Sequence, residues 1–217
     1  MVFFDCGSWG KAICSLLMSV SQGQERIRCF IALPVDAGVL GIVQQLQCSL
    51  RDRLASDIVQ WTRPAQIHLT LKFLGNVLAS SVEDLITALR QACQGVGPFK
   101  LRLDTLGCFP SSRAPRIVWI GLAGDLGTLL ELQGRIARRM TAFSAHDDSH
   151  AFHPHLSIGR VKRAHQEMAG VIGKVIVEAG NPEPAEWTVG QVELIRSVLG
   201  SQGSTYSNLA VVSLAHR

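Results

Sequence analysis

The sequence lacks the cysteine spacings that mark a metal ribbon or a redox site. Its six cysteines are scattered, and no two of them form a C-x-x-C pair. That absence argues against a zinc ribbon and against a thioredoxin-like dithiol. A chain of 217 residues does not need a disulfide scaffold, so we expect reduced thiols and a cytoplasmic protein. The cysteines are Cys6, Cys14, Cys29, Cys48, Cys93 and Cys108.

Apolar runs long enough to cross a bilayer are missing as well. The run from Ala12 to Val20 is too short for a transmembrane helix. Together with Lys11 it has some features of a signal peptide, but Asp5 precedes it and no clean cleavage site follows. We therefore expect residues 1–25 to be a disordered extension, with Met18 as an alternative start, and residues 26–217 to form one domain.

Charge and aromatic residues are both sparse. Charged residues make up 18% of the chain and hydrophobic residues 47%, which is typical of a globular protein. The net charge of +4 agrees with a phosphate-bearing partner but does not identify one. With one Tyr, four Trp and eight Phe, the sequence does not indicate which ring would stack on a base.

One stretch, residues 67–74, alternates polar and apolar side chains without a break. This pattern predicts a strand with one face in a core and the other exposed. Residues two apart on a strand are roughly 6.6 Å apart, so an imidazole and a hydroxyl can reach different oxygens of one phosphate. The core-facing set is Ile67, Leu69, Leu71 and Phe73, and the opposite set is His68, Thr70 and Lys72.

The same design returns 87 positions later, where His155 and Ser157 alternate with Leu156 and Ile158. A repeated local pattern half a domain apart predicts two similar lobes that present their histidine strands to a shared cleft. A single histidine on a strand is usually structural, but two such strands in order are a specific signal.

These two segments resemble the paired His-x-Thr/Ser-x signatures (HXTX motifs) of the 2H phosphoesterases. The most similar branch is the RNA 2',3'-cyclic phosphodiesterases, also called 2'-5' RNA ligases. The resemblance covers nearly all of residues 26–214. It implies an α+β, bilobed fold with two pseudo-symmetric lobes of mainly antiparallel sheet, helices packed outside and a cleft between them. Further matches lie at Arg28–Leu33, Trp61–Pro64, Phe109-Pro110, Pro115–Trp119, Phe152–Pro154 and Gly203–Tyr206.

Periodicity along the chain agrees with an α+β fold. Strands and helices alternate, and the strands themselves alternate in polarity, which favours mainly antiparallel sheets. One helix has a possible capping box in Ser80 and Glu83. Strands are expected at 27–33, 67–74, 99–103, 116–122, 187–199 and 206–214, and helices at 39–54, 82–89, 125–143 and 164–179, the third buried through Leu126, Leu129, Leu130, Ile136 and Met140.

Opening a cyclic phosphate with water needs one base and one acid, and two histidines can supply both near neutral pH without a metal or cofactor. Thr70 and Ser157 can donate hydrogen bonds to the phosphate oxygens that gain charge. Residue types alone do not tell acid from base. The resemblance implies that His68 is the proton donor and His155 the proton acceptor, acting on RNA or an oligonucleotide with a 2',3'-cyclic phosphate terminus.

Two further cations are secondary candidates for phosphate binding. Lys72 shares the predicted face of His68, although its counterpart in the repeat is Gly159. Strict alternation places Arg160 on the face of Leu156 and Ile158, unless a bulge redirects it toward the cleft. The family further implies a monomer without a membrane partner, in which hydrolysis predominates and reverse 2'-5' ligation is possible.

Two other readings stay open at this point. Residues 146–155 hold four histidines and two aspartates, which suits a zinc- or manganese-dependent hydrolase centred on His146, Asp148 and His150. Such a site would not explain His68, Thr70 or the repeat. The second alternative is a non-catalytic RNA-binding module, against which the two intact histidine motifs speak.

Overall fold

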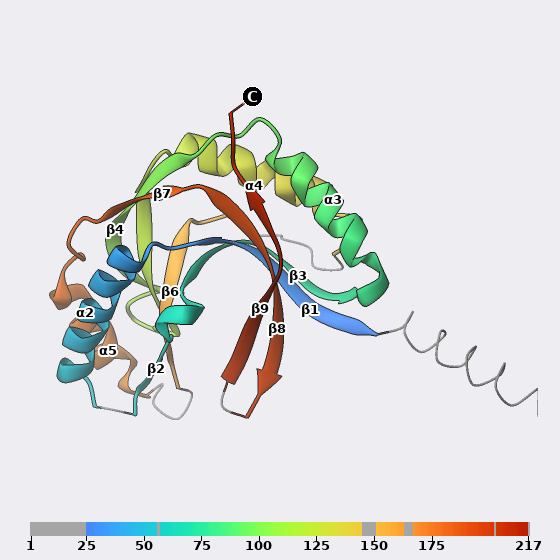
Figure 1. Cartoon of the computed structure of the whole chain (residues 1–217). Helices are drawn as coiled ribbons and strands as arrows, with labels where there is room; N and C mark the ends of the chain where they lie inside the picture. Colours follow the sequence, from blue (N-terminus) through green and yellow to red (C-terminus); the bar gives the residue numbers. More distant parts are fainter. Residues whose placement is uncertain (1–24, 56, 145–150, 163–166, 202, 217) are drawn as a thin grey trace, which may run out of the picture.

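A computed structural model describes residues 25–55, 57–144, 151–162, 167–201 and 203–216. Within these residues the chain forms one four-stranded and one five-stranded sheet with antiparallel pairing (Figure 1). The first sheet contains, in spatial order, β3 (His68–Leu78), β1 (Arg26–Pro34), β8 (Gln191–Gly200) and β9 (Gly203–Ser213). The second contains β2 (Val59–Trp61), β6 (His155–Val161), β5 (Ile117–Gly124), β4 (Phe99–Phe109) and β7 (Glu186–Val189).

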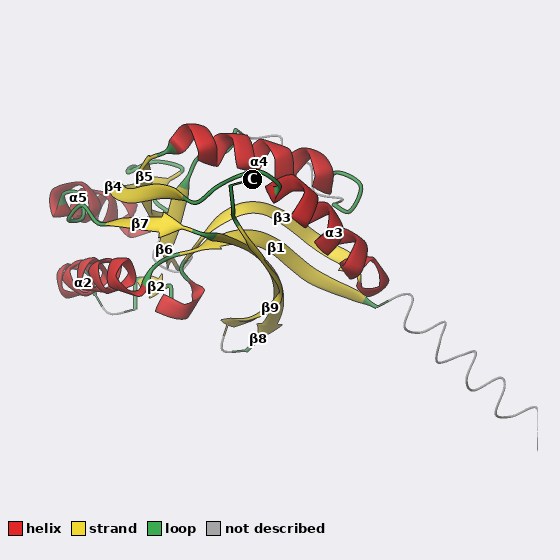
Figure 2. Ribbon diagram, turned by 45° about the horizontal axis from the view of Figure 1, so that its top comes forward, coloured by secondary structure: helices red, strands yellow, loops and turns green. Residues whose placement is uncertain are grey.

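The helices cover the outer sides of these sheets, and the first sheet is strongly curled (Figure 2). Helix α3 packs against α4, which lies on β3, whereas α2 packs against α5, which lies on β4. This arrangement confirms the expected α+β fold. The helices are α2 (Ala37–Arg53), α3 (Val82–Cys93), α4 (Leu126–Met140) and α5 (Ala169–Ala179), with short 3-10 helices η1 (Pro64–Gln66) and η2 (Ala79–Ser81).

Alternation along β1 separates two apolar environments. Cys29, Ile31 and Leu33 belong to a large buried cluster that extends through both sheets and all four of these helices. Phe30 and Ala32 point to the other face of the sheet, where they form a small cluster with Ile195. Strand β1 therefore has a core face and a second face that is available to the site.

The internal repeat extends to the pairing register. The order β3-β1-β8-β9 corresponds to β6-β5-β4-β7 in the second sheet. In the first sheet Lys72 pairs with Ile31 and Thr70 with Ala32, leaving Leu71 as an extra residue. In the second, Gly159 pairs with Val118 and Ser157 with Trp119, leaving Ile158 as the extra residue. Both motif strands thus carry a β-bulge at equivalent positions, 87 residues apart.

The first bulge corrects the predicted faces of Phe73 and Lys72. Directly paired residues of an antiparallel sheet project to the same side. Phe73 pairs with Phe30 and is 49% exposed, so it lies on the face of His68 instead of in the core. Lys72 pairs with the core residue Ile31 and is only 6% exposed, so it does not share the face of His68. An extra residue breaks the period of two, and nothing in residues 67–74 announces it.

Other differences concern element boundaries. The strand expected at 187–199 breaks at Gly190 into β7 and β8, which belong to different sheets. Strand β2 was not expected, and β3 continues through Gly75 to Leu78. Helix α3 begins after Ser81, which makes no side-chain capping bond, and Leu130 is 48% exposed.

Several predictions fall outside the described residues. They include the extension at 1–24, the histidines and aspartates at 146–150, and part of the segment before α5. Among the helices of the described residues, none is long and apolar enough to cross a membrane. Two arginines of α4 contact α3 and the residue after it: Arg139 donates a hydrogen bond to the Gln91 side chain, and Arg135 donates one to the backbone carbonyl of Gln94.

Candidate active site

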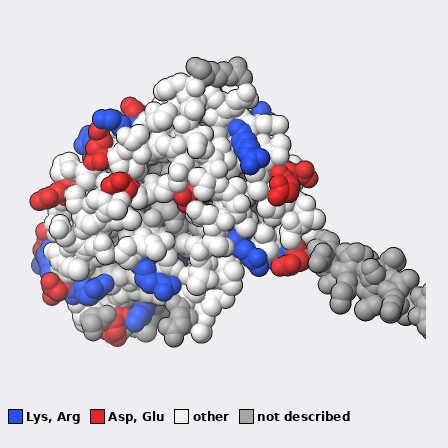
Figure 3. Space-filling view, viewed as in Figure 1, with Lys and Arg blue, Asp and Glu red and all other residues white. Residues whose placement is uncertain are grey.

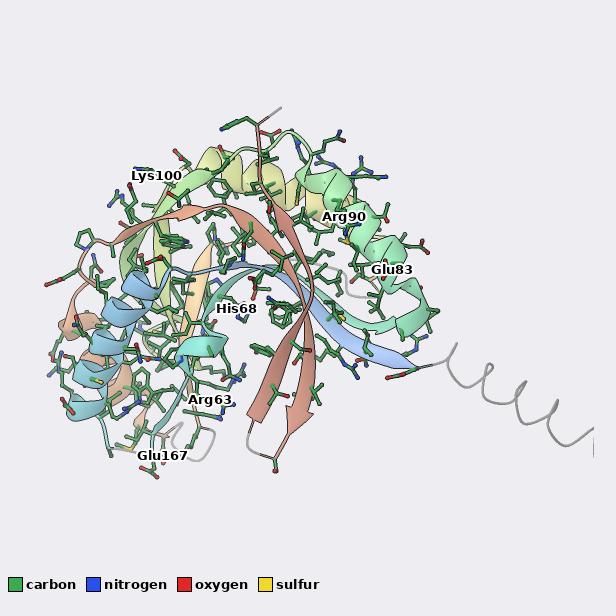
Figure 4. The ribbon with its side chains drawn as sticks, viewed as in Figure 1. Arg63, His68, Glu83, Arg90, Lys100 and Glu167 are labelled. Atoms are coloured by element: carbon green, nitrogen blue, oxygen red, sulfur yellow. The ribbon has the colours of Figure 1, made fainter. Side chains whose placement is uncertain are left out.

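His68 is the first residue of β3 and lies among aromatic rings. Its imidazole stacks on Phe30 with ring centroids 4.7 Å apart, and Tyr206 of β9 packs edge-on at 5.5 Å. Figure 4 shows His68 on the inner side of its strand, facing the β8–β9 pair. Burial lowers the pKa of His68 to about 4, and a hydrogen bond to the backbone of Gln66 opposes that effect. The ring therefore favours the neutral form in the free protein.

His155, the first residue of β6, has an equivalent setting. The Phe109 and Trp119 rings lie at centroid distances of 5.1 and 6.3 Å. Its Nδ1 lies 2.7 Å from the backbone carbonyl oxygen of His153. Burial lowers the pKa of His155; the bond to the His153 backbone raises it, and the nearby His153 charge lowers it further.

The bond from His155 determines which ring nitrogen can take up a proton. A carbonyl oxygen only accepts, so Nδ1 must carry the hydrogen and donate it to His153. In the neutral ring Nε2 then holds the free lone pair. Gln66 and His153 are 87 positions apart, so each motif histidine is bonded to the backbone two residues before it.

The pairing register shows on which face of its sheet each remaining candidate residue lies. Ser157 is exposed and pairs with Trp119, on the face of His155, and Thr70 pairs with Ala32 on the face of His68. Beyond the bulge at Ile158, Arg160 pairs with Ile117, so it lies on the same face as Ser157 and is exposed. The bulge therefore redirects Arg160 toward the site, as it redirects Phe73 in the other sheet.

A buried glutamine joins the two halves. Gln47 of α2 is 4% exposed, and its Nε2 donates to the carbonyl oxygens of Thr62 at 2.9 Å and Ile158 at 2.8 Å. The Thr62 backbone N–H also donates to the Ile158 carbonyl at 2.9 Å. These bonds hold the segment that leads to His68 against the strand that begins with His155, and β3 and β6 are in contact.

Trp119 fits beside His155 because the adjacent strand carries a glycine. A Cβ on Gly107, which pairs with Trp119, would lie 2.4 Å from the indole ring. The Trp119 Nε1 is buried and has no hydrogen-bond partner among the described residues. The indole therefore acts as an apolar wall of the His155 site.

The metal interpretation gains no support from the part of the chain that the structure describes. Within that part, no three His, Cys, Asp or Glu side chains are grouped as metal ligands. His153 is exposed, and its carbonyl oxygen accepts the bond from His155. His146, Asp148 and His150 lie outside the described residues.

The sequence reasoning missed the aromatic residues of the site. Phe30, Phe109, Trp119 and Tyr206 stood out only as matches to the family, and Phe73 was assigned to the core. The period-two pattern of β1 does place Phe30 on the face opposite Ile31. Tyr206 reaches His68 only through the curl of the sheet, for which its own segment carries no signal.

Two pseudo-symmetric antiparallel sheets, each contributing a His-x-Thr/Ser strand, define a phosphoesterase of the two-histidine class. The chain belongs to the 2'-5' RNA ligase superfamily, whose family profile matches residues 35–200. It is 30% identical over 191 residues to the RNA 2',3'-cyclic phosphodiesterase of Methanothermobacter thermautotrophicus, covering 87% of this chain and 100% of that protein. The protein of the same name from Aeropyrum pernix is 30% identical over 171 residues, covering 76% and 93%.

Solved structures show the same fold. Escherichia coli LigT in complex with 3'-AMP superposes with a TM-score of 0.71 at 21% identity, covering 88% of this chain and 100% of that one. TT0787 of Thermus thermophilus superposes with a TM-score of 0.68 at 23% identity, with the same coverage.

Proposed function

We propose that this protein hydrolyses RNA 2',3'-cyclic phosphate ends to 2'-phosphomonoester ends, with His68 as proton donor and His155 as proton acceptor. The names of its relatives support the substrate class. The observation that carries the proposal is the repeat of one histidine setting, including the backbone bond, the hydroxyl two residues on and the bulge, in both sheets.

Each imidazole ring transfers one proton in the proposed reaction. Nε2 of neutral His155 takes a proton from water as the water oxygen bonds to phosphorus. The bond from phosphorus to the ribose O3' breaks, and protonated His68 gives its proton to O3'. The product is a 2'-phosphate beside a free 3'-hydroxyl, and exchange with solvent restores both rings.

Thr70 and Ser157 donate hydrogen bonds to the nonbridging oxygens as negative charge develops. Arg160 supplies a fixed positive charge for the same oxygens, since its guanidinium stays protonated. The structure does not support Lys72 in this role. It pairs with the core residue Ile31, so it lies on the face opposite His68, and it is only 6% exposed.

The low pKa of His68 bears directly on its role as donor. A ring with a pKa of about 4 is mostly neutral at neutral pH in the free protein. A bound phosphodiester carries a negative charge, and an adjacent opposite charge favours the imidazolium form. Substrate binding therefore raises the pKa of the donor and supplies the proton that the reaction needs.

Reverse ligation follows from the same geometry. When a 5'-hydroxyl attacks in place of water and O3' leaves, the new linkage is a 2'-5' phosphodiester. His155 and His68 keep their roles in that step. Which of the two reactions is used depends on the relative access of water and of an RNA 5'-hydroxyl to the site.

That the enzyme is monomeric and cytoplasmic remains a prediction.

Turnover of an RNA oligonucleotide with a 2',3'-cyclic phosphate end tests the proposal, with 31P NMR distinguishing the 2'-phosphate from the 3'-phosphate product. His68→Ala and His155→Ala should each lower kcat by at least about 100-fold. His216→Ala is the matched control, because that histidine is exposed near the C-terminus. Near-normal turnover in either motif variant, or a 3'-phosphate product, would contradict the proposal.

A further inference from the structure

An exposed aromatic ring on the catalytic face has no part in the proposed reaction. Phe73 is 49% exposed, although large apolar side chains are generally buried. Its ring centroid lies 6.1 Å from that of Phe30, which in turn contacts His68 and Tyr206. Phe73 therefore extends the aromatic surface beyond the histidine and leaves a ring open to a ligand.

One arginine, Arg28, continues the same face further along β1. Arg28 is exposed and alternates with Phe30 on the side opposite the core residue Cys29. It pairs with Asn76 of β3 and Ser197 of β8. Tyr206 of β9 also pairs with Ser197, so Arg28 and Tyr206 lie on the two sides of Ser197 in neighbouring strands. Burial raises the pKa of Tyr206 and the charge of Arg28 lowers it, which agrees with this closeness.

The order of these groups along the strands is that of a path leading away from the site. On β3 the residues on this face after His68 are Thr70, Phe73 and Asn76, and on β1 Phe30 is followed outward by Arg28. Steps of two residues are roughly 6.6 Å apart. An RNA chain whose terminal phosphate lies at His68 and Thr70 and which continues along this face would bring its next nucleotide to Phe73 and Arg28.

We propose that Phe73 and Arg28 form a subsite for the penultimate nucleotide of single-stranded RNA, the one before the nucleotide that carries the 2',3'-cyclic phosphate. The base of this penultimate nucleotide stacks on Phe73, and Arg28 contacts the phosphate that joins the last two nucleotides. This assignment rests on the proposed function and names its preferred substrate: an RNA end rather than a free cyclic mononucleotide.

Two observations favour this occupant. The subsite is continuous with the histidine face, so a bound terminus brings its neighbouring nucleotide there. An exposed ring beside a guanidinium complements a base and a phosphate. Figure 3 shows Lys and Arg interspersed with Asp and Glu over the visible face, without one broad basic field there.

The test compares kcat/KM for adenosine 2',3'-cyclic phosphate with that for the dinucleotide ApA ending in a 2',3'-cyclic phosphate. Wild-type protein should prefer the dinucleotide. Phe73→Ala should lower the ratio of the two kcat/KM values by about 5- to 160-fold, which corresponds to the usual ~1–3 kcal/mol for one stacked base. Arg28→Gln should lower it too, and should reduce the salt dependence of dinucleotide turnover by about one phosphate contact.

Two further variants act as controls. Phe73→Tyr keeps the ring and should restore the wild-type ratio. Arg90→Gln removes an exposed arginine on α3, which points away from His68 (Figure 4), and should leave the ratio and the salt dependence unchanged.

The outcomes separate this inference from the proposed function. Equal turnover of both substrates by wild-type protein, or an unchanged ratio in Phe73→Ala and Arg28→Gln, would overturn the subsite while leaving the phosphodiesterase proposal intact. Turnover of neither substrate would overturn both.

Discussion

Replacing His68 by Gln should make the protein less sensitive to acid. The pKa of His68 is about 4 in the folded protein, against 6.5 for the unperturbed ring. Between these values the unfolded chain binds a proton that the folded protein does not, so the free energy of unfolding falls as pH falls. The loss begins near pH 6.5 and ends near pH 4.

The magnitude follows from the size of the shift. A difference of about 2.5 pKa units corresponds to about 3.4 kcal/mol at full protonation. Between pH 7 and pH 4.5 most of that difference develops, about 2.4 kcal/mol. His68 is partly exposed, so solvent screening reduces the expected value to about 2 kcal/mol.

Urea unfolding of wild-type protein and His68→Gln at pH 7 and pH 4.5 measures this contribution. The wild type should lose about 2 kcal/mol more than the variant over that interval. Ser157→Ala, which removes a hydroxyl and no titrating group, should show the wild-type loss. If His68→Gln lost as much stability as the wild type, His68 would not be held neutral by burial, and the reasoning about the donor would be wrong.

Three further outcomes follow from the site. Thr70→Val and Ser157→Ala should each lower kcat by less than either histidine variant, since proton transfer remains; a loss as large would indicate a structural or nucleophilic role instead. The pH profile of kcat/KM should be bell-shaped with its maximum below pH 6.5, because burial lowers both histidine pKa values. EDTA should leave this profile unchanged. Activity that is lost to EDTA and rescued by zinc or manganese would instead support a metal site in residues 146–150. Gln47→Leu should lower the free energy of unfolding by about 1–3 kcal/mol in urea titrations, because the Thr62 carbonyl oxygen loses its Gln47 donor and the Ile158 carbonyl oxygen keeps only the Thr62 N–H. An unchanged value would refute the role of Gln47 as a junction.

Local sequence pattern was sufficient to single out the two motif histidines as candidates and to predict the fold class. The period of two at residues 67–70 and 155–158 reflects only the direction of successive side chains on a strand, so it could be read without knowing any partner strand. The distance of 87 residues between the motifs then implied two matched halves. The faces of Thr70 and Ser157 relative to their histidines follow from the same local rule, and the register agrees with them.

The positions beyond the hydroxyls depended on tertiary structure. A bulge exists only relative to a partner strand, so Leu71 and Ile158 could not be identified as extra residues from their own segments. Because each bulge reverses the side to which later residues project, it turns Phe73 and Arg160 toward the site. For the same reason it turns Lys72 to the core side.

Tertiary structure also decided which distant residues complete each site. Tyr206 reaches His68 because four paired strands curl, and Gln47 reaches Ile158 because α2 packs beside β6. Their sequence neighbours carry no pattern that specifies these partners, since each contact depends on the summed twist and packing of elements far apart in the chain. The candidate histidines and hydroxyls were thus readable from the sequence, whereas the aromatic and cationic side chains around them come together only in the folded chain.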